Sequence, residues 1–396
     1  MGCCRQDMTG GWSIGRWKIS GQAVLVAQVW LLSRLLIAVV GVALMVTQGW
    51  TAGELVRRWD ALHFMAIAAN GYADATTAAF FPGLPLLLRA GTLVGLPMEL
   101  TGVIVAAVGS ALAAAALCRL FGAPAACLWL LAPTAVFTAV GYTEAPFCAA
   151  AFWAWQRARD SHWGQAGVLA GLACTFRVSG VFLVAGLACL AVFGLQRGGA
   201  SCAIEPGPRH VWGTRWGTRL RRLAWLAIPV AVLAAFECYL RGVTGSWTAW
   251  LDAEQAGWTR GFAWPWQSLL NTVRAGHLAT WPGRPDVAWV FRAEVVSMAA
   301  GLAATVWCLA RRRWPSAVFV GLQVVVFGTS WWYMSVNRAV LVWFPLWAML
   351  GAAVIWRPGG RRHRTAWRFG VGVGIVVSVV AMVVWAWLFF TGRWAS

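Results

Sequence analysis

Uncharged apolar stretches of roughly 18–25 residues recur along this 396-residue chain, and they constrain its fold more than any other feature. A helix of about 20 apolar residues is long enough to cross the hydrocarbon core of a bilayer. A soluble domain carries about a quarter charged residues, whereas this chain is 60% hydrophobic and 11% charged. The sequence therefore predicts an all-α polytopic membrane protein.

Eleven membrane spans follow from the apolar windows and the helical period of the sequence. They cover residues 23–46, 100–121, 123–141, 144–158, 164–178, 179–196, 223–241, 288–310, 315–331, 337–356 and 369–391. We expect one integral membrane domain over residues 1–396, with its N-terminus in the cytoplasm and its C-terminus outside. Three connections between the spans are long: a first outer loop, a basic cytoplasmic loop and a second outer loop, at 47–99, 197–222 and 243–287.

The formal net charge of +19 would suit nucleic acid, but the distribution of the charge indicates a membrane. Basic residues cluster in links between spans, at Arg157 and Arg159, in the 197–222 loop, at 311–313 and at 361–368. This is the positive-inside pattern of membrane proteins, with anionic lipid headgroups as neighbours. We expect membrane lipids as partners and no nucleic acid, because no aromatic and basic platform or zinc knuckle accompanies the charge.

The acidic residues and the cysteines narrow the kind of site that this chain can build. Most acids fall in the predicted outer loops or at the outer ends of spans, so polar chemistry is expected on the outer face. The ten cysteines are scattered, mostly within apolar spans, and show no spacing typical of a metal site. The sequence therefore predicts neither a metal nor a cofactor.

The first outer loop carries the densest group of polar and aromatic residues. Its sequence predicts a helix over 54–70, on which Asp60 and His63 share one face. Gly71 supplies a stop for this helix, and a second apolar helix follows at 84–96. We expect the first of these helices to lie along the outer surface.

Asp60 has two interpretations. It can cap the helix or pair with Arg57 or Arg58, which are common structural roles for an aspartate. Alternatively, it is a general base at the membrane boundary and takes a proton from a sugar hydroxyl that attacks a lipid-linked donor. His63 is either a half-buried structural residue, or it hydrogen-bonds Asp60 or a donor phosphate.

Charged residues near or inside the apolar spans also have two interpretations. Arg34 and Arg177 either form structural salt bridges with Glu144 or another acid, or bind a lipid phosphate, since guanidinium pairs with phosphate in bidentate fashion. Glu144 stands at a predicted helix start, where it can cap the helix or bind substrate. Arg338 lies at another predicted outer helix start, which suits an anion site or simple solvation.

Three ordered motifs occupy the first half of the chain. They are Trp59-Asp60-Ala61 with His63-Phe64, Ile67-Ala68, Gly71-Tyr72 and Ala79-Phe80-Phe81-Pro82-Gly83-Leu84-Pro85-Leu86; Leu131-Ala132-Pro133 with Val136-Phe137, Ala139, Gly141-Tyr142-Thr143-Glu144-Ala145 and Phe147; and Arg177-Val178-Ser179-Gly180. Together with Ser33-Arg34, they resemble the PIG-V-type mannosyltransferases, which add the second mannose in GPI-anchor synthesis and have bacterial relatives. The resemblance covers about residues 24–190 and is loose beyond them, where Arg338 and Pro345 fit approximately. The third motif departs from the family's Arg-Ser-Asn-Gly at its two middle positions, which leaves the acceptor open.

The resemblance implies a GT-C glycosyltransferase, a bundle of about eleven transmembrane helices with a helical first outer loop. Such an enzyme inverts the sugar in a single displacement, here transferring mannose from polyprenyl-phosphate-mannose to a lipid-linked or cell-envelope glycan acceptor. Its catalytic acid in the first outer loop is Asp60. The residues expected to bind substrate are Arg34, Trp59, His63, Tyr72, Phe81, Tyr142, Glu144, Arg177 and Arg338. We expect no metal, because the phosphate leaves as an anion that Arg177 or Arg338 can stabilise.

Other functions stay open. A GT-C transferase of another sugar would share the same motifs. A lipid or glycolipid transporter would have symmetric halves with broken helices, which the sequence does not display, and a non-catalytic assembly subunit would leave Asp60 without a role. Lys18 is the only lysine and residues 392–396 carry no retention signal, so we expect a bacterial cell membrane rather than the endoplasmic reticulum.

Overall fold

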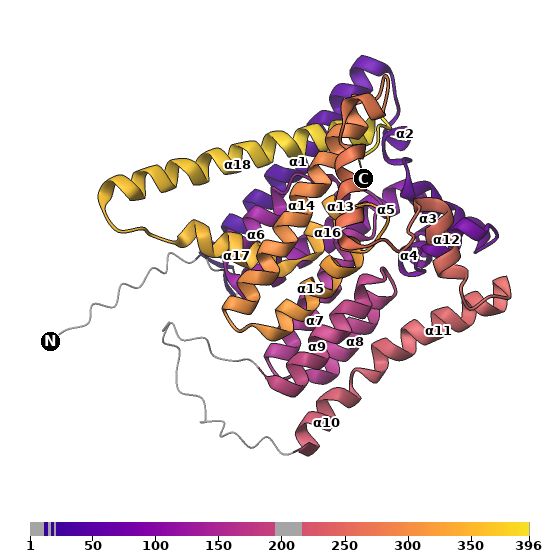
Figure 1. The fold of residues 1–396 in the computed structure, drawn as a ribbon, viewed down its shortest axis with the longest axis horizontal. Coiled ribbons are helices and arrows are strands. Elements are labelled where there is room, and N and C mark those ends of the chain that lie inside the picture. The colour runs from indigo at the N-terminus through magenta and orange to yellow at the C-terminus, as the bar shows by residue number, and fades with distance from the viewer. Residues whose placement is uncertain (1–11, 15–16, 20, 195–215, 396) are drawn as a thin grey trace.

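The computed structural model describes residues 12–14, 17–19, 21–194 and 216–395, and it shows a bundle of helices (Figure 1). The predicted all-α class is confirmed, apart from a short antiparallel hairpin near the N-terminus. Its strands are β1 (Trp12–Ile14) and β2 (Trp17–Ile19), with Trp12 opposite Ile19. Most of the predicted basic loop at 197–222 lies outside the described residues.

Long apolar helices confirm a multi-pass membrane protein. Within the described ranges, five helices are long and apolar enough to cross a bilayer. They are α1 (Gly21–Gln48), α5 (Met98–Phe121), the joined pair α10 (Trp216–Ala224) and α11 (Ala227–Thr244), α14 (Pro285–Ala310) and α18 (Arg361–Phe390). A sixth crossing is possible if α16 (Val336–Val342) and α17 (Phe344–Ile355) form one bent span. The predicted number of eleven is therefore not confirmed.

Shorter helices account for the difference in number. They are α6 (Ala123–Leu130), α7 (Glu144–Arg159), α8 (Trp163–Cys174), α9 (Ser179–Phe193) and α15 (Trp314–Gly328). The predicted span at 123–141 was wrong as one helix, because the chain leaves α6 at Leu131 and continues as the short 3-10 helix η2 (Ala135–Thr138). Pro133 explains this break, since proline lacks the backbone N–H and clashes with the preceding helical turn.

The predicted span at 337–356 is also broken. Helices α16 and α17 meet at Trp343 with a bend of 73°. Pro345, near the start of α17, cannot donate a hydrogen bond to the carbonyl of Leu341. That carbonyl instead accepts a hydrogen bond from the indole N–H of Trp129 at 2.8 Å. The break therefore does not leave the buried carbonyl of Leu341 unpaired, which would be energetically costly.

Close contact between α5 and α7 forms the centre of the bundle. A Cβ atom added to Gly109 of α5 would lie 2.8 Å from the backbone carbon of Ala145, and one added to Gly102 would lie 2.8 Å from Cα of Gly141. These glycines therefore let α5 approach the backbone at the start of α7. Large aromatic side chains such as Trp129 and Phe147 are fully buried around this contact.

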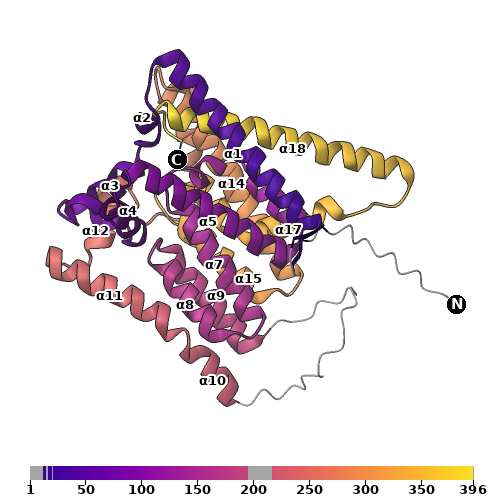
Figure 2. The same ribbon diagram turned by 180° about the vertical axis from the view of Figure 1, so that it is seen from behind.

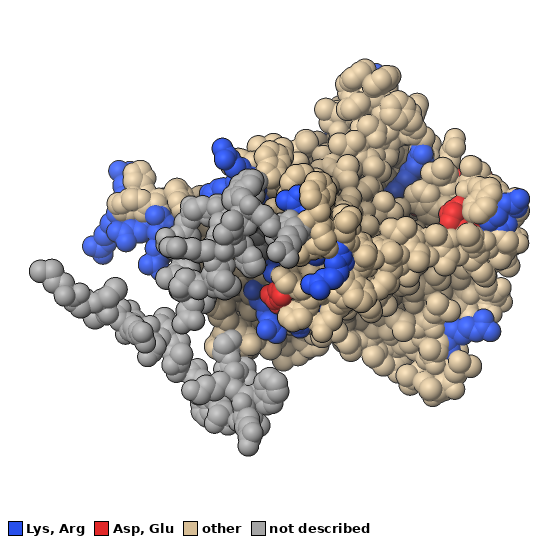
Figure 3. Space-filling view, turned by 90° about the horizontal axis from the view of Figure 1, so that it is seen from below, with Lys and Arg blue, Asp and Glu red and all other residues tan. Residues whose placement is uncertain are grey.

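Elements of the two predicted outer loops gather on one side of the bundle. They are α2 (Ala52–Val56), α3 (Asp60–Asn70), η1 (Ala75–Ala79), α4 (Gly83–Leu93), α12 (Ala249–Trp258), α13 (Pro265–Ala275) and η3 (Leu278–Thr280). Helices α3, α4 and α12 lie together in both ribbon views, far from α10 (Figures 1 and 2). The face seen from below Figure 1 carries many basic and few acidic side chains (Figure 3).

The first outer loop differs from its prediction in one respect. The predicted single helix over 54–70 was wrong, because α2 ends before Arg57 and α3 starts at Asp60. Thr51 and Glu54 form a reciprocal capping box at the start of α2, and these hydrogen bonds lower the pKa of Glu54. Gly71 ends α3 with a φ of 72°, as predicted.

The close approach of α5 and α7 makes Gly109 sensitive to any added side chain. We expect Gly109→Ala to destabilise the protein by about 1–3 kcal/mol, because the new methyl group would overlap the backbone of α7. The matched control is Gly242→Ala on α11, where no described atom lies within 4 Å of the new Cβ. That control should be neutral or slightly stabilising through helix propensity. Thermal unfolding in detergent measures both, and equal melting temperatures would contradict the packing.

Candidate active site

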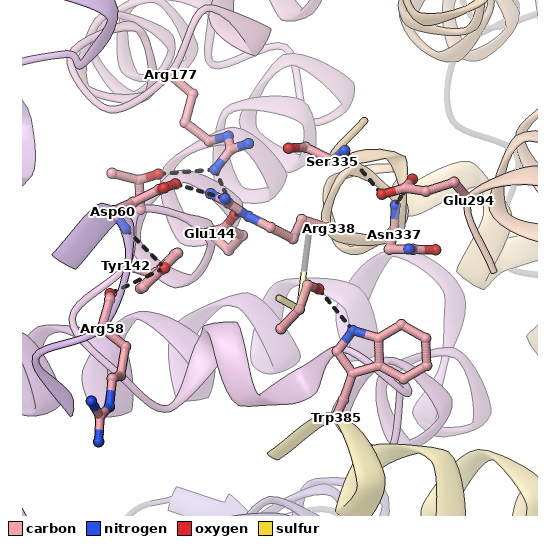
Figure 4. A network of polar contacts seen from close by, with 12 residues as sticks. Arg58, Asp60, Tyr142, Glu144, Arg177, Glu294, Ser335, Asn337, Arg338 and Trp385 are labelled. Carbon is pink, nitrogen blue, oxygen red and sulfur yellow. Dashed lines mark hydrogen bonds and ion pairs between the residues drawn. The ribbon is translucent and has the colours of Figure 1, made fainter. Parts of the chain in front are cut away.

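Four charged side chains from distant parts of the sequence meet at one place (Figure 4). Asp60 begins α3, Glu144 begins α7, Arg177 lies between α8 and α9, and Arg338 lies on α16. Nη1 of Arg338 donates to Oδ2 of Asp60 at 2.6 Å, and its Nε donates to Oε1 of Glu144 at 2.7 Å. Nη1 of Arg177 donates to the same Glu144 oxygen at 2.7 Å. The four formal charges balance.

Glu144 is the buried centre of this cluster. Its side chain is 0% exposed, compared with 16% for Arg177 and 8% for Arg338. A buried carboxylate is tolerated only when it is paired and hydrogen-bonded, and here two guanidinium groups share one oxygen. Thr143 adds a hydroxyl acceptor for Arg177 at 2.9 Å. The other oxygen, Oε2, is buried and has no hydrogen-bond partner among the described residues.

Aromatic rings fix the guanidinium group of Arg338. Its central carbon lies 5.1 Å from the ring centre of Phe137 and 4.9 Å from that of Tyr142, within the range of cation–π attraction. The Tyr142 hydroxyl also accepts the backbone N–H of Asp60 at 3.2 Å and donates to the carbonyl of Arg58 at 3.4 Å. Tyr142 therefore connects Arg338 to the start of α3.

The structural interpretations of Asp60, as a helix cap or as a partner of Arg57 or Arg58, were wrong. Arg57 pairs with Glu99, and the guanidinium group of Arg58 lies 5.1 Å from the ring of Trp50. The cap position before α3 is occupied by Trp59, whose φ of 52° is a sparsely populated conformation for a bulky residue. The carboxylate of Asp60 instead reaches Arg338 and is 16% exposed. Asp60 is thus the cluster's accessible carboxylate, whereas Glu144 is sealed inside.

Helix α12 of the second outer loop brings a further carboxylate to the edge of the site. Glu254 pairs with Arg260 at 3.2 Å, and burial raises the pKa of Glu254 above its usual range. Trp258 on the same helix contacts the first outer loop, with ring centres 5.4 Å from Phe80 and 6.5 Å from His63. The two outer loops therefore form one wall beside Asp60.

The structure brings five of the predicted site residues into direct contact: Asp60, Tyr142, Glu144, Arg177 and Arg338. Arg177 forms the salt bridge with Glu144 that one of its two interpretations predicts, and a phosphate-binding role for Arg177 stays a prediction. Arg34 instead donates to the carbonyl and hydroxyl of Thr138 on η2 at 2.6 and 3.0 Å, so an acid partner for it was wrong. Arg34 therefore holds η2, the 3-10 helix that contains Phe137. A substrate role for Arg34 stays a prediction.

The remaining predicted residues belong to the outer loop itself. Tyr72 is buried and donates to the carbonyl of Phe80 at 2.8 Å. Phe81 packs on Phe236 of α11, with ring centres 4.8 Å apart. His63 stacks on Phe80 at 4.8 Å rather than bonding Asp60, and Trp59 is 41% exposed. Contact of these four with substrate stays a prediction.

Sequence reasoning missed Glu294, which lies inside the predicted span at 288–310 and is 0% exposed. It accepts the backbone N–H groups of Ser335 and Asn337, next to Arg338. An acidic residue within an apolar span is itself a signal of function or of a specific partner. Glu294 could therefore have been identified from the sequence as a candidate site residue.

Comparison with known proteins supports the predicted resemblance for the part of the chain that holds most of the cluster. Residues 42–205 match the family model described as Mannosyltransferase (PIG-V). This part of the chain is related to the PIG-V mannosyltransferases. GPI alpha-1,6-mannosyltransferase 2 of Rattus norvegicus is 38% identical over 146 residues, which cover 32% of this chain and 30% of that protein. The Cricetulus griseus and Homo sapiens proteins of the same name are each 39% identical, over 147 and 113 residues. Those alignments cover 32% and 24% of this chain and 30% and 23% of the two proteins.

The match therefore spans less than a third of the length of these relatives. Among solved structures, ArnT from Cupriavidus metallidurans bound to undecaprenyl phosphate aligns with a TM-score of 0.46 and 15% identity. That alignment covers 92% of this chain and 76% of ArnT.

The buried pairing makes Glu144 critical for stability. We expect Glu144→Gln to lower the free energy of unfolding by about 3–5 kcal/mol, because two arginines would then face a neutral amide. The control is Glu99→Gln, which breaks a pair with Arg57, whose side chain is 57% exposed. It should cost less than about 1 kcal/mol. Thermal unfolding in detergent compares the two, and similar losses would argue against a buried charge cluster.

Proposed function

We propose that this protein is an inverting mannosyltransferase that uses polyprenyl-phosphate-mannose and glycosylates a lipid-linked or cell-envelope glycan on the outer face of the membrane. The relation of residues 42–205 to PIG-V mannosyltransferases supports the reaction class. The observation that carries the proposal is Asp60, an accessible carboxylate held at a buried arginine. Asp60, Glu144 and Arg177 all lie in the family-related segment.

Asp60 acts as the general base in this proposal. The acceptor hydroxyl loses its proton to the Asp60 carboxylate while its oxygen attacks C1 of the mannose. The bond between C1 and the phosphate oxygen breaks at the same time, so the sugar inverts and polyprenyl phosphate leaves with the electron pair. One carboxylate is enough, because the leaving group departs as an anion and needs no proton from the protein.

Arg338 and Arg177 stabilise the phosphate. Arginine stays protonated in proteins and binds phosphate through two parallel N–H groups. In the free protein, Arg338 holds Asp60 with Nη1. A donor phosphate beside Arg338 competes for this group, and its binding releases Asp60 toward the acceptor. Glu144 retains both arginines during the exchange because it is bonded to each of them.

The proposed reaction keeps the sequence prediction of a metal-independent transfer without a cofactor. Charge on the leaving phosphate is met by prearranged cations, which is an effective form of transition-state stabilisation. The acceptor and the membrane that holds the enzyme follow the sequence predictions and are part of the proposal.

A lipid or glycolipid transporter is the alternative that one observation favours. The broken span formed by α16 and α17 resembles the discontinuous helices that transporters place at their binding sites. In that case Asp60 would bind cargo without accepting a proton, and no glycosidic bond would form.

Replacing Asp60 by asparagine tests the base directly. We expect Asp60→Asn to reduce mannose transfer by about 100-fold or more, since removal of a general base has effects of this size. The fold should survive because the asparagine oxygen can still accept the hydrogen bond from Arg338. Transfer of radiolabelled mannose from polyprenyl-phosphate-mannose to extracted envelope lipids, in membranes, measures the activity.

Asp74→Asn is the matched control from the same loop. Asp74 is exposed and accepts hydrogen bonds from Thr76, which lower its pKa, and in the described part of the chain its side chain makes no hydrogen bond or ion pair with the four charged residues of the cluster. The control should retain activity. Full activity of a well-folded Asp60→Asn protein would refute the base, and transfer from glucose or arabinose donors alone would refute the mannose donor.

A further inference from the structure

Helix α16, which carries Arg338, cannot hold its own orientation. It has seven residues (Val336–Val342) and ends at the 73° bend before α17. Ser335, which precedes it, has a φ of 66° and makes no side-chain cap of its own. An isolated helix of this length is unstable, so neighbouring elements must fix the direction in which Arg338 points.

Glu294 of α14 supplies this constraint at the start of the helix. Its Oε1 accepts the backbone N–H of Ser335 at 3.0 Å, and its Oε2 accepts that of Asn337 at 2.9 Å. Both N–H groups belong to the turn that begins α16, where helices leave donors unsatisfied. The Glu294 carboxylate therefore accepts a hydrogen bond from each of two backbone N–H groups in the turn immediately before Arg338 (Figure 4).

Further contacts from α14 reinforce the same turn. Ser297 donates its hydroxyl hydrogen to Oδ1 of Asn337 at 2.7 Å, and Nδ2 of Asn337 donates to the carbonyl of Val290 at 3.3 Å. The other end of α16 is held by Trp129 on Leu341 and by Trp347, which donates to the carbonyl of Val340 at 2.9 Å. Of these groups, Glu294 alone carries a charge, and it is fully buried.

We propose that Glu294 is a positioning residue for the transferase reaction, acting through Arg338. Glu294 fixes the turn from which the guanidinium group of Arg338 reaches Asp60 and Glu144. It therefore controls whether Arg338 hydrogen-bonds Asp60 or the donor phosphate. This role rests on the proposed function for its kinetic effect, but its effect on the contact between Arg338 and Asp60 does not depend on that function.

Glu294→Gln is the informative substitution. Glutamine keeps the size of the side chain but replaces one acceptor oxygen with a donor, which would face a backbone N–H. We expect the turn to shift and transfer activity to fall by on the order of 10- to 100-fold, as a displacement of about 1 Å in a catalytic site produces. The loss should lie in kcat and in the KM for the donor, with an unchanged KM for the acceptor. The matched control is Thr305→Val on the same helix, because the Thr305 hydroxyl donates to the carbonyl of Gly301 within α14.

A double substitution separates positioning from general stability. If Glu294 acts through Arg338, then Glu294→Gln should add little to the loss caused by Arg338→Lys. A purely structural role would make the two losses multiply, and this result would overturn the proposal.

A chemical readout is independent of any mannose transfer. Asp60 is partly exposed and bonded to Arg338, so its labelling by a water-soluble carbodiimide and an amine, followed by mass spectrometry, reports this contact. We expect labelling of Asp60 to increase severalfold in Glu294→Gln and to stay unchanged in Thr305→Val. Ser297→Ala, a milder change at the same turn, should increase it less and serves if Glu294→Gln does not fold. Labelling equal to wild type in the folded variants would overturn the proposal, whereas absence of transfer by the wild type would refute only the proposed function.

Discussion

The buried carboxylate of Glu144, shared by two arginines, is the interaction on which the site depends. Arg177 and Arg338 both donate to its Oε1 at 2.7 Å, although Arg338 is 194 residues away in the sequence. A charge with no exposed surface has a large desolvation cost unless it is paired, so the two arginines must lie where Glu144 holds them. Arg338 in turn fixes the position of Asp60 through a hydrogen bond. The arginine that offsets the desolvation cost of Glu144 therefore also positions Asp60.

This arrangement divides the chain into a family-related part and a part that completes it. Residues 42–205 contain Asp60, Glu144 and Arg177, whereas Arg338 and the Glu294 that holds its turn come from the second half. Short helices with specific backbone contacts, such as α16, place one guanidinium group accurately without requiring an extended sequence motif. That is a physical reason why the resemblance weakens beyond about residue 190 while the site still includes residues from that region.

Local chemistry made part of this structure predictable. Apolar length identified the membrane class, and Gly71 was readable as a helix stop because a positive φ favours glycine. The break at 57–59 was missed, and the capping box of Thr51 and Glu54 could not have shown it, because it marks the start of α2 and not its end. The partners of Arg177 and Arg34 stayed open for a different reason. A salt bridge between residues far apart in sequence depends on how helices pack, and no local pattern distinguishes Glu144 from Thr138 as the partner of an intramembrane arginine.

In the proposed reaction, the role of Asp60 depends on a competition at Arg338. In the free protein, one guanidinium group satisfies Asp60, Glu144 and two aromatic rings at once. An aspartate held this way is fixed in position, but its Oδ2 already accepts a hydrogen bond from the guanidinium group and is not free for an acceptor hydroxyl. We propose that a donor phosphate removes this conflict, because it offers Arg338 a bidentate anionic partner and leaves the carboxylate oxygen for the acceptor hydroxyl. In the proposed reaction the base therefore becomes competent only after the lipid-linked sugar has bound.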